Sequence, residues 1–295
     1  HAAAQSRSCL GGDPGHAEDG VKTKKRSRAL TAALVLAAAA FLLPQLWLFS
    51  LSTKTKAQVY EYPPRLVSEG ASLHNYAVVL ERTQIPFYLW NSARVAVLAT
   101  LFTLLAAIPA AYILSRERFA QADFVMLLFL AAQMVSPLIL LVPIYGLVAR
   151  LGLLDTHAGL ILVYAAIQIP FSVVVLKSFF DGLPASLFEA ARLDGCSRFG
   201  VFRLVALPLL GPGLASVAIF NLSAYWSEFC LALVLLDSQS RFTIPVGLFS
   251  FQSGYETEWH LVAAASFIGL MPVLVAFIAL QRFFVTGLTA GATKG

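Results

Sequence analysis

Six long apolar stretches constrain the fold of this chain more than any other feature of its sequence. An α-helix rises 1.5 Å per residue, so about 20 apolar residues are needed to cross the roughly 30 Å hydrocarbon core of a bilayer. The stretches that reach this length are residues 29–51, 93–114, 124–148, 158–180, 209–236 and 261–284. They predict an all-α integral membrane protein whose six transmembrane helices form one domain over residues 29–284.

The composition agrees with this fold class and excludes two others. Charged residues make up 13% of the chain and hydrophobic residues 58%, whereas soluble domains carry roughly 25% charged residues. The net charge is +5, but the basic residues are scattered in short segments between the apolar stretches rather than gathered on one soluble face. An ordinary soluble domain is therefore excluded, and no nucleic-acid partner is expected.

The first apolar stretch follows a basic run, so it has two interpretations. The run consists of Lys22, Lys24, Lys25, Arg26 and Arg28. A cleaved signal peptide is one interpretation, but the apolar stretch is longer than a signal core and lacks a clear small-residue cleavage site. We therefore interpret it as a retained membrane anchor behind a disordered or cytoplasmic segment, residues 1–28. One hypothesis places the natural start of the protein at Val21, which would make residues 1–20 non-native.

The distribution of Lys and Arg favours an orientation with the N-terminus in the cytoplasm. An even number of spans then places both termini inside, together with the segment around residue 189. Two outer segments, residues 52–92 and 237–260, are long enough to carry function.

No pattern in the sequence indicates catalysis or metal binding. The cysteines (Cys9, Cys196 and Cys230) and the five histidines are isolated from one another, and no HExxH, GxSxG or phosphate-binding loop occurs. We expect no metal site, no catalytic residue and no enzymatic activity.

A charged segment, residues 181–208, separates the fourth apolar stretch from the fifth. Pro184 suits the first turn of a helix, and Ser186 with Glu189 has the spacing of a capping box. Gly195 can end this helix in the left-handed conformation, and Ser197 can cap a second one. The segment therefore predicts a helix-turn-helix elbow.

The elbow has two interpretations from its residues alone. Small residues at Ala190, Ala191 and Gly195 allow another backbone to approach closely, and three phenylalanines could anchor a partner's groove; these are Phe188, Phe199 and Phe202. Alternatively, Glu189 only caps its own helix and the aromatic rings lie on lipid headgroups.

The spacing within this segment resembles a family signature. The pattern is Glu-Ala-Ala, three residues, Gly, nine residues, an aliphatic residue, one residue and Leu-Pro. Its positions are Glu189, Ala190, Ala191, Gly195, Val205, Leu207 and Pro208. This resembles the Glu-Ala-Ala (EAA) coupling loop in permease subunits of bacterial ATP-binding-cassette importers. The stretches "NSARVAVLAT", "AAYILSRERF", "LGLLDTHAGLIL" and "GLTAGATKG" are similar to the carbohydrate-uptake, MalG-like branch of that family.

The resemblance implies a function and a set of partners. The coupling loop would dock in a partner ATPase, which binds ATP and Mg²⁺, so the chain itself would bind no cofactor. The implied assembly contains a second permease in a heterodimer, an ATPase dimer and an extracytoplasmic solute-binding protein in the bacterial inner membrane. Its substrate would be a sugar, oligosaccharide, polyol or glycerol phosphate.

The resemblance also implies two further contact regions. The tail, residues 285–295, would reach between the ATPase subunits through Gly287, Thr289, Gly291, Lys294 and Gly295. The second outer segment would contact the binding protein through Phe251, Gln252, Ser253, Gly254 and Tyr255, although its composition alone also fits an interfacial aromatic belt.

Polar residues in the fifth apolar stretch are candidates for a translocation path: Asn221, Ser223, Tyr225, Trp226 and Glu228. A carboxylate about 12 Å inside a span usually faces a cavity or a partner. Hydrogen bonds between helices are the alternative. Ser227 stands where the family often has Asn, which puts any role of that amide in doubt.

Two other functions share some of these features. An importer for a non-sugar solute would carry the same elbow. A stand-alone carrier driven by an ion gradient would need a membrane-embedded carboxylate, for which Glu228 is the obvious candidate, but it leaves the elbow unexplained.

Overall fold

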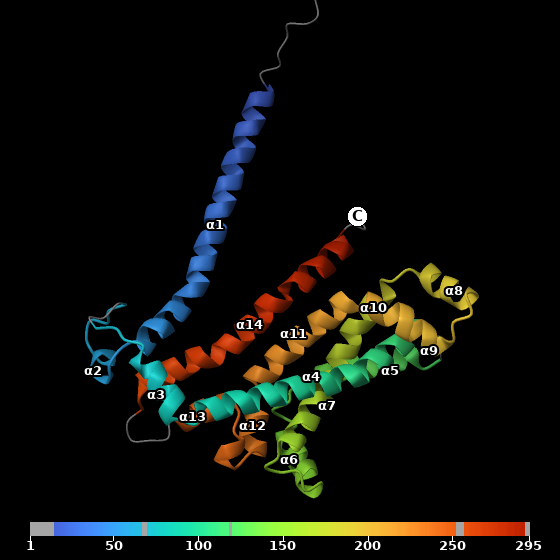
Figure 1. The fold of residues 1–295 in the computed structure, drawn as a ribbon. Coiled ribbons are helices and arrows are strands. Elements are labelled where there is room, and N and C mark those ends of the chain that lie inside the picture. The colour runs from blue at the N-terminus through green and yellow to red at the C-terminus, as the bar shows by residue number, and fades with distance from the viewer. Residues whose placement is uncertain (1–14, 67–69, 118–119, 252–256, 293–295) are drawn as a thin grey trace, which may run out of the picture.

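The computed structural model describes the backbone of residues 15–66, 70–117, 120–251 and 257–292, and side chains within residues 30–279. Every regular element in these ranges is a helix (Figure 1), which confirms the predicted all-α class. The long helices are α1 (Gly15–Ser52), α4 (Ile85–Arg116), α7 (His157–Asp181), α11 (Gly211–Ser227) and α14 (Trp259–Ala292). The shorter ones are α2 (Lys56–Val59), α3 (His74–Arg82), α5 (Ala122–Gln133), α6 (Leu141–Arg150), α8 (Ala185–Leu193), α9 (Arg198–Val201), α10 (Leu207–Leu209), α12 (Cys230–Leu235) and α13 (Ile244–Ser250), with a π-helical turn η1 (Phe202–Ala206) and a 3₁₀ turn η2 (Gln239–Arg241).

Four single helices in the described part of the chain are long and apolar enough to cross a membrane. They cover Ala33–Ser52, Ile85–Arg116, His157–Asp181 and Trp259–Ala279. A fifth candidate is the pair Arg198–Leu209 and Gly211–Ser227, which meet at a bend of 71°. The predicted count of six spans therefore stays a prediction.

Two of the predicted spans are interrupted. Residues 124–148 form the two shorter helices α5 and α6, separated by residues 134–140. Pro137 explains this gap, because proline lacks an N–H and disfavours the helical conformation of the residue before it. Residues 209–236 are divided between α11 and α12, with the break at Glu228 and Phe229.

Helices α4 and α7 pack together at the centre of the described structure, and α11 packs against both of them and against α14. The core next to the elbow contains Phe180, Phe188, Val201 and Leu210, all at most 6% exposed. A second cluster, further along α4 and α7, includes Tyr164 and Tyr225.

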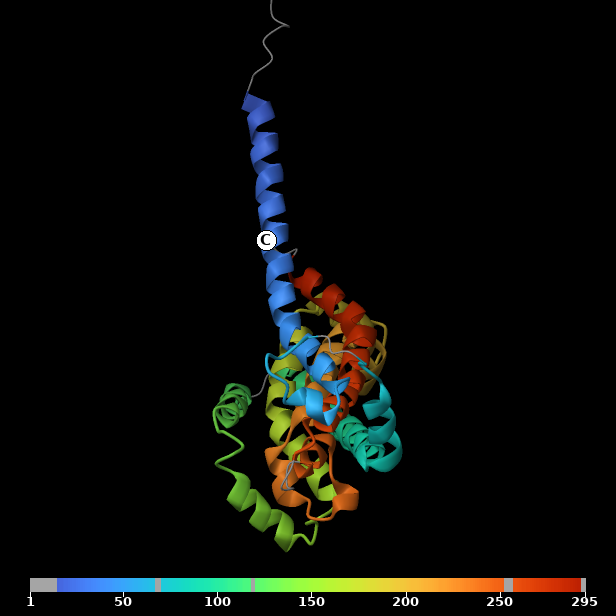
Figure 2. The same cartoon turned by 90° about the vertical axis from the view of Figure 1, so that its left-hand side faces the viewer.

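Helix α1 extends away from the other helices in Figures 1 and 2. It is held near its C-terminal end, where the Ser52 hydroxyl is hydrogen-bonded to the Tyr76 hydroxyl and Phe49 lies against Phe267. The apolar side chains of α1 are largely exposed, including Phe41 at 82%. Exposed leucines also cover much of α5, as expected for helices that face lipid or another membrane subunit.

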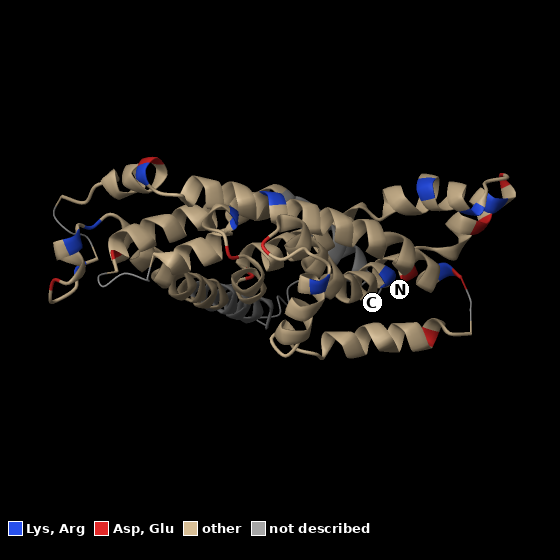
Figure 3. Ribbon diagram, turned by 90° about the horizontal axis from the view of Figure 1, so that it is seen from below, with Lys and Arg blue, Asp and Glu red and all other residues tan. Residues whose placement is uncertain are grey.

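Charged residues are rare along the long helices. In Figure 3, Lys, Arg, Asp and Glu lie at the end that holds α8 and α9, at the opposite end and in segments near the middle of the view, while the long helices are tan for most of their length. This distribution fits the low cost of charges near membrane surfaces and their high cost within the hydrocarbon core.

Candidate functional site

The elbow consists of residues 184–209 and has the corner that its sequence predicts. Helix α8 ends in a Schellman motif, in which the amides of Gly195 and Cys196 donate to the carbonyls of Arg192 and Ala191 at 3.1 and 3.0 Å. Gly195 has φ +86°, a conformation that glycine adopts without steric cost. The predicted corner at Gly195 is confirmed.

The capping of the two elbow helices follows the prediction in one case only. Ser197 caps α9, since its Oγ accepts a hydrogen bond from the Gly200 amide at 3.1 Å. The predicted capping box of Ser186 and Glu189 is wrong, because α8 begins at Ala185 with Pro184 as its N-cap and has no side-chain cap. Ser186 therefore lies inside the first turn.

The signature residues fall on both faces of the elbow. Glu189 and Ala190 are exposed, and Glu189 has no hydrogen-bond or ion-pair partner among the described residues. Ala191 is 8% exposed and faces the core, so it cannot form the small-residue docking patch expected for it. Val205 and Leu207 are half-buried and Pro208 is exposed. The second half of the elbow passes through η1 and α10 to the 71° bend.

Two of the three elbow phenylalanines pack against the chain's own core, and the third is exposed as predicted. Phe188 is 6% exposed, since it lies one helical turn from Ala191 on the inner face. Phe202 packs on the ring of Tyr112, with centroids 4.9 Å apart. Phe199 alone of the three is strongly exposed, at 67%, and Leu193 at the end of α8 is 89% exposed. The exposed surface of the elbow therefore includes the Glu189 carboxylate and the large apolar side chains of Leu193 and Phe199.

The polar residues of α11 form hydrogen bonds between helices. The Asn221 amide donates to the Ser172 hydroxyl on α7 at 3.0 Å, and both residues are fully buried. The Tyr225 hydroxyl lies 2.7 Å from that of Thr103 on α4, and Trp226 Nε1 donates to the Gly269 carbonyl on α14 at 2.9 Å. These contacts favour the interhelical interpretation of the three residues.

Glu228 occupies the break between α11 and α12. Its carboxylate accepts hydrogen bonds from the Tyr164 hydroxyl at 2.7 Å and from the amides of Leu231 and Ala232 at 2.9 and 3.1 Å. The two amides belong to the first turn of α12, where unpaired N–H groups and the helix dipole favour a negative charge. Glu228 therefore caps α12 and ties it to α7.

Ser223 differs from its neighbours because it is exposed. It lines a cavity of about 430 Å³ between α4, α11 and α14, together with Ser216, Trp226 and mainly apolar side chains such as Phe220 and Phe277. The Ser227 hydroxyl donates to the Ser223 carbonyl of its own helix at 2.9 Å, so it makes a local bond where the family often has an amide.

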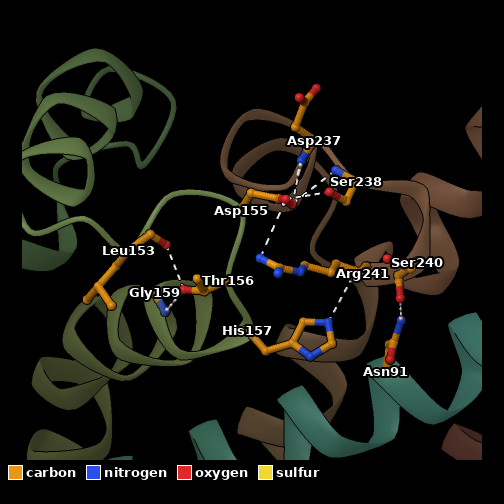
Figure 4. A network of polar contacts seen from close by, with 10 residues as sticks. All are labelled: Asn91, Leu153, Asp155, Thr156, His157, Gly159, Asp237, Ser238, Ser240 and Arg241. Carbon is orange, nitrogen blue, oxygen red and sulfur yellow. Dashed lines mark hydrogen bonds and ion pairs between the residues drawn. The ribbon is translucent and has the colours of Figure 1, made fainter.

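A second polar network, shown in Figure 4, holds residues 237–241 against the start of α7. The Asp155 carboxylate accepts the amides of Asp237 and Ser238, both at 3.0 Å, and the Ser238 hydroxyl at 2.5 Å, and it lies 3.5 Å from the Arg241 guanidinium. Partial burial raises the pKa of this carboxyl, but the hydrogen bonds and Arg241 outweigh it, so the pKa lies below its ordinary value. We call residues 237–243 the clamped loop.

Helix α4 holds the same loop from its own N-terminal part. The Asn91 side chain donates to the carbonyls of Ser240 and Phe242, both at 3.0 Å, and the Ser92 hydroxyl accepts the Ile244 amide at 2.7 Å. Asp155 and Asn91 were not among the predicted site residues. An isolated Asn near the start of an apolar stretch is the sequence signal that could have identified the second of them.

The remaining predicted positions are only partly described. Phe251 is half-buried at the end of α13, and the other four residues predicted to contact a binding protein lie outside the described residues. Gly287, Thr289 and Gly291 lie within α14, whose side chains are not described there, and Lys294 and Gly295 lie outside the described residues. No group of three or more His, Cys, Asp or Glu side chains that could hold a metal ion occurs in the described part of the chain.

Comparisons with known proteins give a consistent result. Residues 93–289 match the family described as "Binding-protein-dependent transport system inner membrane component". The chain is 32% identical to the sulfoquinovosyl glycerol transport system permease protein SmoH of Agrobacterium fabrum, covering 92% of this chain and 94% of SmoH. It is 34% identical to the trehalose/maltose transport system permease protein MalG of Thermococcus litoralis, covering 88% of this chain and 94% of that MalG.

The fold is similar to that of a solved transporter. A chain of a bacterial ABC transporter involved in the import of the acidic polysaccharide alginate superposes with a TM-score of 0.76 at 22% identity, covering 88% of this chain and 98% of that one.

Proposed function

Because this chain belongs to the family of inner-membrane components of binding-protein-dependent transport systems, we propose that it is the permease subunit of an ATP-driven importer for a carbohydrate or related solute. The observation that carries this proposal is the elbow. On its exposed surface lie the Glu189 carboxylate and the large apolar side chains of Leu193 and Phe199, as expected of a surface for a separate subunit. The named transport systems of its relatives support the substrate class.

The elbow is the contact with an ATPase in this proposal. A groove in the partner would cover the two large apolar side chains, and a basic group in that groove would pair with the Glu189 carboxylate. The attraction between these two charges becomes stronger as water is excluded. Closure of the ATPase dimer would then move the elbow and, through the bend before α11, the membrane helices. The cavity would face alternately outward and inward.

The remaining partners follow from the same arrangement. A second permease would cover the exposed apolar helices, and a solute-binding protein would deliver the substrate at the end that carries the clamped loop. This places the elbow and both termini in the cytoplasm of a bacterium. A maleimide that cannot cross membranes should then label Cys196 in inverted vesicles and not in intact spheroplasts.

Reconstitution tests the proposal directly. The chain, co-expressed with an ATPase, a second permease and a binding protein from the same organism, should form a complex stable in mild detergent. Proteoliposomes of this complex should take up the sugar that the binding protein retains, only when ATP and Mg²⁺ are supplied on the elbow side. Retention of an amino acid or a metal ion by the binding protein would refute the carbohydrate class.

A stand-alone carrier driven by an ion gradient is disfavoured by Glu228. Its carboxylate already accepts three hydrogen bonds and caps a helix, so it is committed to structure rather than free to bind and release a cation. Uptake driven by a proton or sodium gradient in liposomes that hold this chain alone would reverse that conclusion.

A further inference from the structure

The elbow is attached to the rest of the chain through the last turn of α4. Tyr112 packs on Phe180 and Phe202, with centroid distances of 5.5 and 4.9 Å. The Ser115 hydroxyl donates to the Asp181 carboxylate at 2.6 Å. Arg116 is the last residue of this helix. The end of α4 therefore contacts the end of α7 as well as the elbow.

Arg116 contacts three consecutive segments at once. Its guanidinium donates from Nη2 to the Phe180 carbonyl in the last turn of α7 and to the Leu183 carbonyl, the latter at 2.9 Å, in the connection to α8. It also lies over the ring of Phe188 in α8, 4.0 Å from the ring centroid. A cation at a helix C-terminus is favourable in its own right, because the last carbonyls lack partners.

We propose that Arg116 is the positioning residue that fixes the elbow to the ends of α4 and α7, so that a displacement of the elbow moves both helices together. This inference rests on the proposed function, in which a separate ATPase moves the elbow. The planar guanidinium suits the task, because it can donate two hydrogen bonds and stack on an aromatic ring at the same time. A lysine ammonium can replace the charge but not this combination.

A second polar contact between the end of α4 and the elbow is weaker. Arg198 on α9 lies 3.5 Å from Glu117, but its side chain is 83% exposed, and exposed ion pairs contribute little. Phe188, by contrast, is 6% exposed beneath the Arg116 guanidinium. The Arg116 contact is therefore the more buried of the two polar contacts that join the end of α4 to the elbow.

The attachment matters beyond the elbow because α4 is one continuous helix. Its 32 residues span about 48 Å. Asn91, near the other end, holds two carbonyls of the clamped loop. A movement imposed at Arg116 would thus reach the other end of α4 along one continuous helix.

The test uses the complete importer in proteoliposomes, with Arg116→Gln, Arg116→Lys and the control Arg150→Gln. Arg150 also ends a helix, but its side chain is exposed and that helix, α6, lies well apart from α8 (Figure 1). We expect Arg116→Gln to reduce solute uptake per ATP hydrolysed about tenfold, at the upper end of what a residue that modulates coupling contributes. The uptake per ATP of Arg116→Lys should lie between that of Arg116→Gln and that of the parent. Arg150→Gln should have the same uptake per ATP as the parent.

A second readout does not depend on transport. Cys196 is half-buried at the corner of the elbow and packs against the neighbouring core cluster. In a background with Cys9→Ser and Cys230→Ser, a loosened elbow should expose Cys196 and raise its rate of alkylation by a maleimide several-fold in Arg116→Gln. If this variant does not assemble, Arg116→Lys supplies both measurements.

The outcomes separate the inference from the function on which it rests. Unchanged uptake per ATP and an unchanged Cys196 alkylation rate in the Arg116 variants would overturn the role of Arg116. A parent complex that hydrolyses ATP without importing any solute retained by its binding protein would instead refute the proposed function, while the alkylation rates would still report on the attachment of the elbow.

Discussion

The Tyr164 hydroxyl on α7 donates a hydrogen bond of 2.7 Å to Oε2 of Glu228, the carboxylate that caps α12. This contact joins a continuous helix to an interrupted one. The Glu228 carboxylate also orders the break after Ser227, because it accepts hydrogen bonds from the two amides that the interruption leaves without helical partners.

Removal of this carboxylate should destabilise the protein. Glu228→Ala leaves two amides and one hydroxyl without their acceptor in a partly buried site, and we expect a loss of about 2 kcal/mol in the free energy of unfolding. Glu228→Gln retains one acceptor oxygen and should lose less. Thermal unfolding in detergent measures both, with the exposed Ser223→Ala as the control. Equal stability of Glu228→Ala and the parent would show that the capping contacts contribute nothing.

Glu189→Ala should leave the stability of the chain almost unchanged and weaken its binding to the ATPase. The side chain is exposed and without a partner among the described residues, so the unfolding free energy should change by less than about 0.5 kcal/mol. Co-purification of the ATPase should fall, because the proposed contact loses its charge. A large loss of stability would instead place Glu189 in an intramolecular contact.

Substitutions of Gly195 should report the cost of the corner. No atom lies within 4 Å of a Cβ built on Gly195, and its φ is +86°, so the penalty is conformational rather than steric. We expect Gly195→Ala to destabilise α8 by about 1 kcal/mol, and Gly195→Asn by less, since asparagine tolerates this conformation better. Hydrogen exchange of the Cys196 amide, which closes the Schellman motif, measures the effect. Faster exchange in Asn than in Ala would contradict the explanation.

The clamped loop should lose its contacts with Asp155 in acid. The pKa of the Asp155 carboxyl is lowered by its hydrogen-bond donors and by Arg241, with burial as the opposing effect. Its contribution to stability is therefore present above the ordinary carboxyl pKa of 3.8 and lost as the pH falls through the lower value of the folded state. Exchange protection of the Ser238 amide should follow this titration in the parent. Asp155→Asn should abolish the pH dependence, and Asp237→Asn, at an exposed carboxylate, should leave it intact.

The helical class, the family and the corner of the elbow could be predicted because each depends on local sequence. Apolar length predicted the long helices, and the Glu-Ala-Ala pattern predicted the family that residues 93–289 match. Gly195 and Ser197 act through their own backbone neighbours. The Ser186 cap was predicted wrongly because helix boundaries shift by one or two residues at little cost.

The long-range contacts could not be predicted in this way. Asn91 and Ser240 are 149 residues apart, and Asp155 and Ser238 are 83 apart. Both pairs form because the starts of α4 and α7 lie next to the clamped loop. The period of the apolar residues within a helix carries no information about which helix ends come together. The interruption at Glu228 was missed for a related reason, since the apolar run continues through it without a proline.

The exposure of α1 has a consequence for how the chain would find the second permease that we propose. In water, a row of leucine and phenylalanine side chains would force association or aggregation, whereas lipid tails solvate such a surface as well as another helix does. A newly made copy can therefore remain in the bilayer as a monomer without a free-energy cost for its exposed apolar side chains. Recognition of the correct partner must then come from the shapes of the two surfaces and from the few hydrogen bonds between them. A mismatched pair would be rejected because its surfaces pack poorly, since both pairs are equally apolar.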